Sequence, residues 1–458
     1  MAIATINPTT GRVEKTFTAH TPDEIEERIA AAAAAAVTLR ATSYAERAQW
    51  MLASADLLEA EADHIAAIMT VEMGKSLAAA RAEALKCVKN MRFYAEHAEQ
   101  FLASEPLSEP SVVGASRAYA KYEPLGVVLA VMPWNYPLWQ VIRFAAPALM
   151  AANVGLLKHA SNVPQSALYL DTLFTRGGFP RGSFGALLVG SAEVDAVIRD
   201  PRVKAVTLTG SEPAGRSVAS IAGASIKKAV LELGGSDPFI VMPSADVDAA
   251  ARVAVTSRTG NNGQSCIAAK RFIVHEDVYD EFASRFVEAM AALTVGDPML
   301  DGTDVGPVAT ESGRADLAEL VDDALALGAT ALVGGALPDG DGWFYPPTVI
   351  ADITPEMRLH QEETFGPVAS LYRVASAEEA IALANGTDFG LSSNVWTTDA
   401  DEKQLFISSI DAGAVFINGM TVSYPELPFG GIKVSGYGRE LAAAGIREFC
   451  NLKTVWEA

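Results

Sequence analysis

The sequence predicts a multidomain α/β protein in which parallel sheets are covered by helices. Three observations support this fold class. Half of the 458 residues are apolar, which is enough for at least one large core. Helical spacing dominates about the first hundred residues. From about Tyr122, short apolar runs alternate with helical segments, as in repeated βαβ units. We expect two α/β domains with a ligand site in the cleft between them.

Composition and charge exclude several classes of function. The chain has 35 basic and 56 acidic residues, a net charge of -21, whereas nucleic-acid binding depends on clustered lysine and arginine. The three cysteines, Cys87, Cys266 and Cys450, lie in unrelated contexts, so we expect no disulfide framework, no metal cluster and a cytoplasmic location. We also expect no signal peptide and no membrane span, because the N-terminus lacks a basic region and polar residues interrupt the apolar run 144–157.

The amino-terminal part is predicted to be helical. Thr21-Pro22-Asp23-Glu24 is typical of a capping box with proline in the first turn. The alanine run 30–36 therefore belongs to a capped helix and is not a linker. Helical spacing of apolar residues continues through 52–68 and 85–101.

Apolar runs that end in polar or glycine-containing turns predict the strands of a first parallel sheet. These runs are 127–132, 155–158, 186–189, 205–209 and 229–233. A second series, 238–241, 271–274, 330–333, 368–372 and 414–418, predicts another α/β domain, with the boundary near Gly234-Gly235. Residues 448–456 predict a terminal strand. An exposed strand usually finds a partner, and we expect a sister subunit to provide it.

Two short motifs carry side chains with reactive chemistry. Cys266 lies in the turn N-G-Q-S-C-I-A, where a buried structural cysteine is an equally good interpretation of the motif alone. Glu232 lies near the end of an apolar run and is followed by two glycines. Burial would raise the pKa of this carboxyl group towards the range of a general base. The alternative is a strand-end acid that faces solvent.

Together these motifs resemble the aldehyde dehydrogenase superfamily, in which the E-L-G-G glutamate and the G-Q-x-C cysteine have the spacing of Glu232 and Cys266. Further motifs follow in the family's order: I-N-P-x-x-G from Ile6, P-W-N-Y-P from Pro133, K-H-A-S from Lys158, T-G-S from Thr209, E-E-T-F-G-P from Glu362 and P-F-G-G-I-K-x-S-G from Pro428. The resemblance covers essentially the whole chain. It implies a variant Rossmann cofactor domain (1–111 and 125–235), an α/β catalytic domain (236–432) and a small β oligomerisation arm (112–124 and 433–458) in a homodimer or homotetramer.

The resemblance also implies a covalent route from an aldehyde to a carboxylate. Cys266 would attack the aldehyde, because a thiolate is the side chain best suited to make a carbonyl tetrahedral at neutral pH. Asn135 and the backbone N–H of Cys266 would stabilise the oxyanion, and Glu232 would activate the water that hydrolyses the thioester. Relatives that transfer the acyl group to coenzyme A do not need this glutamate, so its presence favours hydrolysis.

A nicotinamide cofactor is implied by the resemblance, although no G-x-G-x-x-G fingerprint follows a strand. Gly210-Ser211 lead into a helix whose N-terminus would face the pyrophosphate; an ordinary strand-to-helix turn is the alternative. Many NAD-using relatives have glutamate at the position of Ser161, so NADP is predicted as the preferred cofactor and NAD is the alternative. The predicted cofactor residues are Trp134, Asn135, Lys158, Ser161, Gly210, Ser211, Leu233, Glu363 and Phe365.

Within the superfamily, residues 231–241 and 266–272 are most similar to succinate-semialdehyde dehydrogenases, which implies a four-carbon aldehyde acid as substrate. Arg143, eight residues after Asn135, resembles an arginine that binds the substrate carboxylate in those enzymes. An interhelical or surface salt bridge is the alternative role. Ser423 is a second candidate for substrate binding.

Two positions depart from the pattern of those enzymes. Gly260 occupies the place of a second carboxylate-binding arginine, although Arg258 is close by. Ala268 occupies the place of a second cysteine that forms a regulatory disulfide in some relatives, so that switch is not expected here.

Other functions stay open on the sequence alone. The substrate could be another semialdehyde or an aliphatic aldehyde. A cofactor-free thiol esterase or hydrolase would need a histidine partner for Cys266, and none of the six histidines lies in a recognisable hydrolase motif. An inactive binding protein is the third alternative, but it would not be expected to keep every polar residue of the site.

Overall fold

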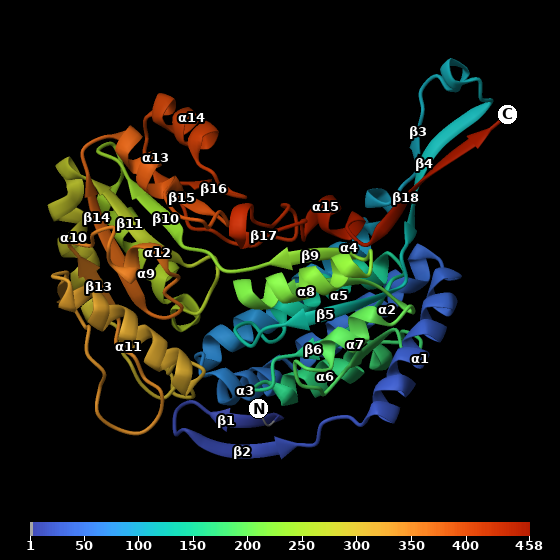
Figure 1. Ribbon diagram of the computed structural model, residues 1–458, viewed down its shortest axis with the longest axis horizontal. Helices are drawn as coiled ribbons and strands as arrows, with labels where there is room; N and C mark the ends of the chain where they lie inside the picture. The colour runs from blue at the N-terminus through green and yellow to red at the C-terminus, as the bar shows by residue number, and fades with distance from the viewer. Residues whose placement is uncertain (1–2) are drawn as a thin grey trace.

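The chain forms two α/β lobes, each built on its own sheet, and an antiparallel arm that projects from the first lobe (Figure 1). The computed structural model describes residues 3–458. Within that range, no helix combines the length and the apolar character needed to cross a membrane.

The first lobe contains a six-stranded sheet in the order β17-β9-β8-β5-β6-β7. All pairings are parallel except that of β17 with β9. The carboxyl ends of β5, β6, β8 and β9 therefore meet at one edge, where α/β sheets bind ligands. The strands are β5 (Val127–Met132), β6 (Val154–His159), β7 (Phe184–Ala186), β8 (Val203–Thr209), β9 (Lys228–Glu232) and β17 (Gly436–Tyr437).

Helices cover this sheet and form a further layer on top of it. Helices α5 (Trp139–Met150) and α6 (Pro164–Arg176) pack on the sheet. They also contact the further layer, which consists of α2 (Tyr44–Ala60), α3 (Ala62–Met73) and α4 (Leu77–Phe101). Three other helices pack on the sheet: α1 (Pro22–Arg40), α7 (Val194–Arg199) and α8 (Glu212–Ala224). Helix α1 begins at the predicted capping box, in which Thr21 and Glu24 bond each other's backbone N–H groups. The prediction of a capped helix is confirmed.

The second lobe contains a seven-stranded sheet in the order β12-β13-β14-β11-β10-β15-β16, which is parallel except for β12. Its core is separate and rich in phenylalanine, with Phe239, Phe272, Phe282 and Phe286 all buried. The strands are β10 (Asp237–Val241), β11 (Ala269–His275), β12 (Thr330–Val333), β13 (Thr348–Ala351), β14 (Val368–Val374), β15 (Ser393–Trp396) and β16 (Val415–Ile417). The helices are α9 (Val247–Thr259), α10 (Glu276–Ala291), α11 (Glu311–Ala326), α12 (Arg358–Gln361), α13 (Ala377–Asn385) and α14 (Ala400–Ser409).

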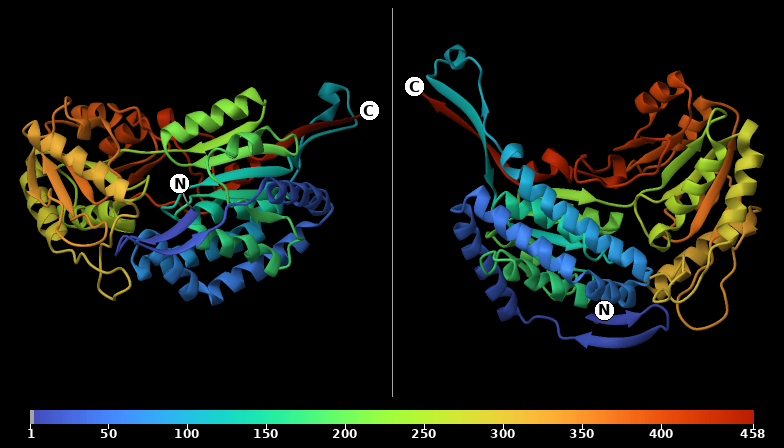
Figure 2. Two further views of the ribbon diagram at one scale, coloured as in Figure 1. Left: turned by 60° about the horizontal axis from the view of Figure 1, so that its bottom comes forward. Right: turned by 180° about the vertical axis from the view of Figure 1, so that it is seen from behind.

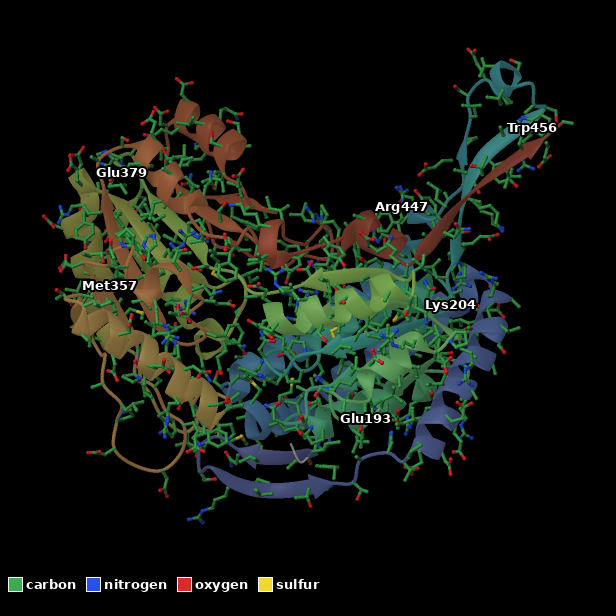
Figure 3. All side chains as sticks on the ribbon, in the orientation of Figure 1. Glu193, Lys204, Met357, Glu379, Arg447 and Trp456 are labelled. Carbon is green, nitrogen blue, oxygen red and sulfur yellow. The ribbon has the colours of Figure 1, made fainter. Side chains whose placement is uncertain are left out.

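The arm joins distant parts of the chain and extends away from both lobes (Figure 2). After α15 (Ala442–Arg447), strand β18 (Cys450–Glu457) pairs antiparallel with β4 (Arg117–Pro124), which also pairs with the short β3 (Glu105–Pro106). Trp456 lies near the tip of the arm (Figure 3). At the amino-terminal end, β1 (Ile3–Asn7) and β2 (Arg12–Phe17) form a hairpin.

The observed strands correct the sequence predictions at several places. The run 186–189 was predicted as a strand, but the strand is Phe184–Ala186. Leu187 and Val189 are nevertheless buried, because the chain stays in the core after it leaves the sheet. The terminal strand begins at Cys450, two residues later than predicted, since α15 and its end occupy the residues before it. Strands β1, β2, β3, β4, β13, β15 and β17 were not among the predicted runs. The proposed domain boundaries stay a prediction.

Candidate active site

A cavity of about 270 Å³ lies at the carboxyl edge of the first sheet, against the second lobe. It brings together the predicted nucleophile and most of the predicted cofactor residues. Its lining comes from the loops after β5, β8 and β9 and from the second lobe: Pro133, Trp134, Asn135, Thr209, Gly210, Ser211, Leu233, Gly234, Cys266, Glu363 and Phe365.

Cys266 lies on a tight loop between α9 and β11. Asn261, Asn262 and Gly263 have left-handed φ angles of 58°, 56° and 74°, and asparagine and glycine adopt this conformation at the lowest cost. The Asn262 amide fixes the loop by donating to two backbone carbonyls at 2.8 and 2.9 Å. A Cβ on Gly263 would lie 2.3 Å from the carbonyl carbon of Gly366, so the loop packs directly on the E-E-T-F-G-P segment.

Lys270 ties this loop to Glu363. Its Nζ donates to the carbonyls of Ser265 at 2.9 Å and Cys266 at 2.6 Å, and it lies 3.0 Å from Glu363 Oε1. The sequence analysis did not assign Lys270. The available signal was the pair Lys270-Arg271 at the start of a buried strand, since cationic side chains are costly to bury unless they have partners.

Asn135 lies beside the nucleophile loop and has an amide hydrogen to spare. Its Nδ2 donates to the backbone carbonyl of Gln264 at 3.0 Å, and its backbone carbonyl accepts from Asn261 Nδ2 at 2.9 Å. A side-chain amide has two donor hydrogens. The second is therefore available to a group bound in the cavity that Asn135 and Cys266 both line.

The loop that carries Asn135 is fixed by hydrogen bonds where it leads into α5. The buried ring of His159 hydrogen-bonds through Nε2 to the carbonyl of Pro137 at 2.9 Å, and burial lowers the pKa of His159 to about 4. The Glu83 carboxylate accepts from the backbone N–H groups of Leu138 and Trp139 at 2.8 and 2.9 Å. These contacts fix the start of α5 and therefore the position of Asn135.

Glu232 ends β9 and is buried without a hydrogen-bond partner for either carboxyl oxygen within residues 3–458. Burial raises the pKa of this carboxyl group well above its ordinary value and the charge of Glu440 raises it further, while Arg143 and Arg439 oppose the shift. Glu232 is not in the lining of the 270 Å³ cavity, but its neighbour Leu233 lines that cavity together with Cys266. A buried carboxyl group with a raised pKa is suited to act as a general base.

The two glycines of the E-L-G-G motif make room for other site residues. A Cβ on Gly234 would lie 2.4 Å from Glu363 Oε2, and a Cβ on Gly235 would lie 2.8 Å from the carbonyl oxygen of Cys266. Both glycines are therefore required by the close approach of the second lobe to the end of β9.

The electrostatic surroundings of Cys266 contain no histidine. Burial raises the pKa of the thiol to about 12; Arg143 and Lys270 oppose this shift, and Glu363 and Glu232 add to it. The thiol is therefore mainly neutral at pH 7 in this structure. Within the part of the chain described, the thiol–imidazole pair of a cysteine hydrolase is not formed.

The opposite side of the cavity fits a dinucleotide. Ser211 caps the N-terminus of α8, but its hydroxyl makes no capping hydrogen bond, so N–H groups of the first turn and the positive end of the helix dipole are available to a pyrophosphate. The rings of Trp134 and Phe365 meet edge to face, with centroids 5.7 Å apart. The carboxylate of Glu363 lines the same cavity, and the role of these residues in cofactor binding stays a prediction.

Lys158 and Ser161 lie at and just after the carboxyl end of β6, outside the lining of this cavity. Both are half-buried. Burial lowers the pKa of Lys158, and the negative charge of Glu193 opposes that shift. The two residues share the edge of the sheet with Asn135, because β6 pairs in parallel with β5.

Arg143 and Ser423 lie outside the lining of this cavity, Arg143 within α5 and Ser423 against Trp139 of the same helix. Arg143 is buried in α5, forms an ion pair with Glu440, and lies over the Phe429 ring at 4.6 Å. The ion pair with Glu440 agrees with the alternative role of Arg143 given above, a salt bridge. However, Arg143 Nη2 has no hydrogen-bond partner within residues 3–458, so a donor remains available. Ser423 is buried and accepts from Trp139 Nε1 at 3.1 Å.

Comparison with known proteins identifies the family. The aldehyde dehydrogenase family model matches residues 1–455, and the chain belongs to this family. It is 66% identical over 457 residues to a succinate-semialdehyde dehydrogenase (NADP+) of Mycobacterium avium, covering 100% of this chain and 97% of the relative. A second such protein, from Mycobacterium tuberculosis, is 66% identical over 458 residues, with complete coverage of both chains.

A solved structure extends this comparison to three dimensions. The succinic semialdehyde dehydrogenase from Streptococcus pyogenes, in complex with NADP+, superposes with a TM-score of 0.96 at 38% identity and 99% coverage of both chains. The predictions of the family and of its fold are confirmed.

Proposed function

We propose that this protein oxidises succinate semialdehyde to succinate with NADP as cofactor. One observation carries the proposal: Cys266, Asn135 and the uncapped end of α8 line one cavity, and Leu233, the neighbour of Glu232, lines it too. The names of the mycobacterial relatives and of the streptococcal NADP complex support the choice of substrate and cofactor.

In this mechanism Cys266 is the nucleophile. Its thiolate attacks the aldehyde carbon, and the resulting oxyanion accepts hydrogen bonds from the spare amide hydrogen of Asn135 and the backbone N–H of Cys266. Because burial raises the pKa of the thiol to about 12, the thiol must lose its proton when the ligands bind. The proton of the thiol passes to solvent, and the positive charges of Arg143 and Lys270 favour the thiolate.

The second half of the reaction is hydrolysis. A nicotinamide cofactor, which Glu363 and Phe365 would hold in the cavity lined by Cys266, would supply the hydride acceptor needed to convert the adduct on Cys266 to a thioester. Glu232 then removes a proton from the water that attacks the thioester. Its burial without a hydrogen-bond partner supports this role, since such a carboxyl group is free to bond a water molecule.

The preference for NADP rests on Ser161 and Lys158. Neither side chain would repel a 2′-phosphate, and Lys158 supplies a positive charge at the same edge of the sheet. Arg143 and Ser423 are proposed to bind the substrate carboxylate. The free Nη2 of Arg143 supports its share in this role.

We further propose a cytoplasmic homo-oligomer. The three cysteines are free, as expected in a reducing compartment. The arm exposes Leu452, Trp456, Val112 and Val113, and an exposed strand with apolar side chains is suited to pairing with a second copy. Light scattering coupled to gel filtration will show more than one subunit if this is correct, and a monomer if it is wrong.

The direct test of the activity is NADPH formation with succinate semialdehyde, measured by absorbance. The wild-type protein should form NADPH faster than NADH, and Cys266→Ala should form neither. Butanal and glutarate semialdehyde serve as competing substrates. Higher kcat/KM for either of these, or for NAD over NADP, would contradict the proposed substrate or cofactor.

A further inference from the structure

Lys86 is a partly buried lysine on α4 that faces Trp139 of α5 and the proposed substrate-binding residue Ser423. Its Nζ donates to Ser423 Oγ at 2.8 Å and lies 4.1 Å from the centre of the Trp139 ring. Trp139 and Arg143 lie four residues apart on α5, and therefore on the same face of that helix.

Lys86 differs from the other cations near Cys266 because no protein carboxylate pairs with it. Arg143 pairs with Glu440, and Lys270 pairs with Glu363. Within residues 3–458, Lys86 forms no ion pair, and Ser423 is its hydrogen-bond acceptor. Burial lowers the pKa of Lys86 to about 8, so the group is still mostly protonated at pH 7. A desolvated ammonium group without a counter-ion is a binding site for an anion.

The contacts of Ser423 complete this anion site. Its oxygen accepts one hydrogen bond from Lys86 Nζ and one from Trp139 Nε1 at 3.1 Å. A serine hydroxyl has two acceptor positions and one hydrogen. Because both acceptor positions are used, the hydroxyl hydrogen is left to donate to a ligand. The site therefore offers an ammonium group and a hydroxyl hydrogen side by side.

Lys86 can supply the second positive charge that Gly260 lacks. This chain has glycine where a second cationic side chain was expected, and Gly260 has open space around its Cα. Arg258 does not fill the gap, because its buried guanidinium donates to the carbonyl of Gly263 behind the nucleophile loop. Lys86 instead places a positive charge beside Ser423 from α4.

We propose that Lys86, together with Ser423 and the free Nη2 of Arg143, binds the carboxylate of the aldehyde substrate and sets the preference for aldehyde acids. This inference rests on the proposed function. A carboxylate would replace the missing counter-ion of Lys86 and accept the Ser423 hydroxyl hydrogen. The opposite end of the substrate would then be directed to Cys266.

The test compares Lys86→Met with the matched control Lys89→Met, with NADP present. Lys89 lies one turn further along α4, is exposed, and pairs with Glu426. Lys86→Met should lose about 10- to 100-fold in kcat/KM for succinate semialdehyde, mainly through KM, as expected for one charge-assisted hydrogen bond. Its kcat/KM for butanal, which has no carboxylate, should change less than about threefold. Lys89→Met should resemble the wild type with both substrates.

A conservative variant and a binding measurement separate this inference from the proposed function. Lys86→Arg should regain most of the lost kcat/KM. Succinate binding, measured by calorimetry, should weaken in Lys86→Met and not in Lys89→Met, and this holds even if another aldehyde acid proves to be the better substrate. Equal losses for succinate semialdehyde and butanal, or unchanged succinate binding, would overturn the role of Lys86. Activity of the wild type with butanal alone would overturn the proposed substrate.

Discussion

The carboxyl group of Glu232 occupies the space that a side chain at position 430 would need. A Cβ on Gly430 would lie 2.7 Å from Glu232 Oε1, and Gly430 has a φ angle of 151°, which few other residues adopt. The P-F-G-G motif, almost two hundred residues after β9 in the chain, therefore positions the proposed base. Without this glycine, Glu232 could not keep its place.

Gly430→Ala should displace Glu232 and slow the hydrolysis of the thioester. A shift of about 1 Å in a catalytic group costs about 100-fold in rate, so steady-state turnover should fall by roughly this factor while the first NADPH is still formed quickly. Rapid-mixing absorbance measures both phases. Gly223→Ala is the control, because nothing lies within 4 Å of a Cβ at that position. Equal turnover in the two variants would show that Gly430 does not position Glu232 for hydrolysis.

Asn135→Ala should slow the formation of the tetrahedral adduct. Loss of one oxyanion donor costs roughly 3 to 4 kcal/mol, or about two to three orders of magnitude in kcat. Asn135→Asp keeps the shape of the side chain but removes both donor hydrogens, and it should be at least as slow. Thermal melting of both variants checks that they fold. Near-normal kcat in either folded variant would exclude Asn135 from the oxyanion site.

Much of the fold could be predicted from the sequence because apolar runs and helix caps are local signals. The run 127–132 coincides with β5, and the box at Thr21 marks the start of α1. Strand β15, Ser393–Trp396, was missed because its sequence S-N-V-W is half polar, although all four residues are buried. Its polar side chains are satisfied by tertiary contacts, such as the bond from Thr421 to Asn394, which no local pattern reveals.

In the candidate site, too, residues in local motifs could be predicted and residues defined by distant contacts could not. Cys266, Glu232 and Asn135 lie in motifs that can be read from the sequence, and Cys266 and Asn135 line one cavity with Leu233, the neighbour of Glu232. Lys86 and Lys270 could not be assigned, because a single lysine in a helix or strand carries no motif. Their roles depend on partners far away in the chain: Ser423 for Lys86 and Glu363 for Lys270.

Ser161→Glu should reverse the cofactor preference. A carboxylate at this position would repel the 2′-phosphate of NADP, and a like-charge contact costs several kcal/mol, so kcat/KM for NADP should fall by about 100-fold or more. The value for NAD should stay within about tenfold of the wild type. Ser161→Ala adds no charge and should keep the preference for NADP. An unchanged ratio of kcat/KM for NADP to kcat/KM for NAD in Ser161→Glu would show that the 2′-phosphate does not bind beside position 161.

The reactivity of Cys266 in the cofactor-free protein should rise steeply with pH. Burial raises the pKa of the thiol to about 12, and only the thiolate is alkylated. A raised pKa means that the thiolate is a small fraction at pH 7 and grows about tenfold for each pH unit up to pH 9. Iodoacetamide labelling followed by peptide mass spectrometry measures this rate at Cys266. A plateau below pH 8 would contradict the raised pKa.

The central claim is that Glu232 hydrolyses a thioester formed on Cys266, and Glu232→Gln tests it most directly. The variant is mixed rapidly with NADP and succinate semialdehyde, NADPH is followed by absorbance, and the protein is then analysed by mass spectrometry. The account predicts a burst of one NADPH per subunit, very slow turnover afterwards and an acyl group on Cys266. Steady turnover at the wild-type rate, with no acyl group on the cysteine, would contradict it.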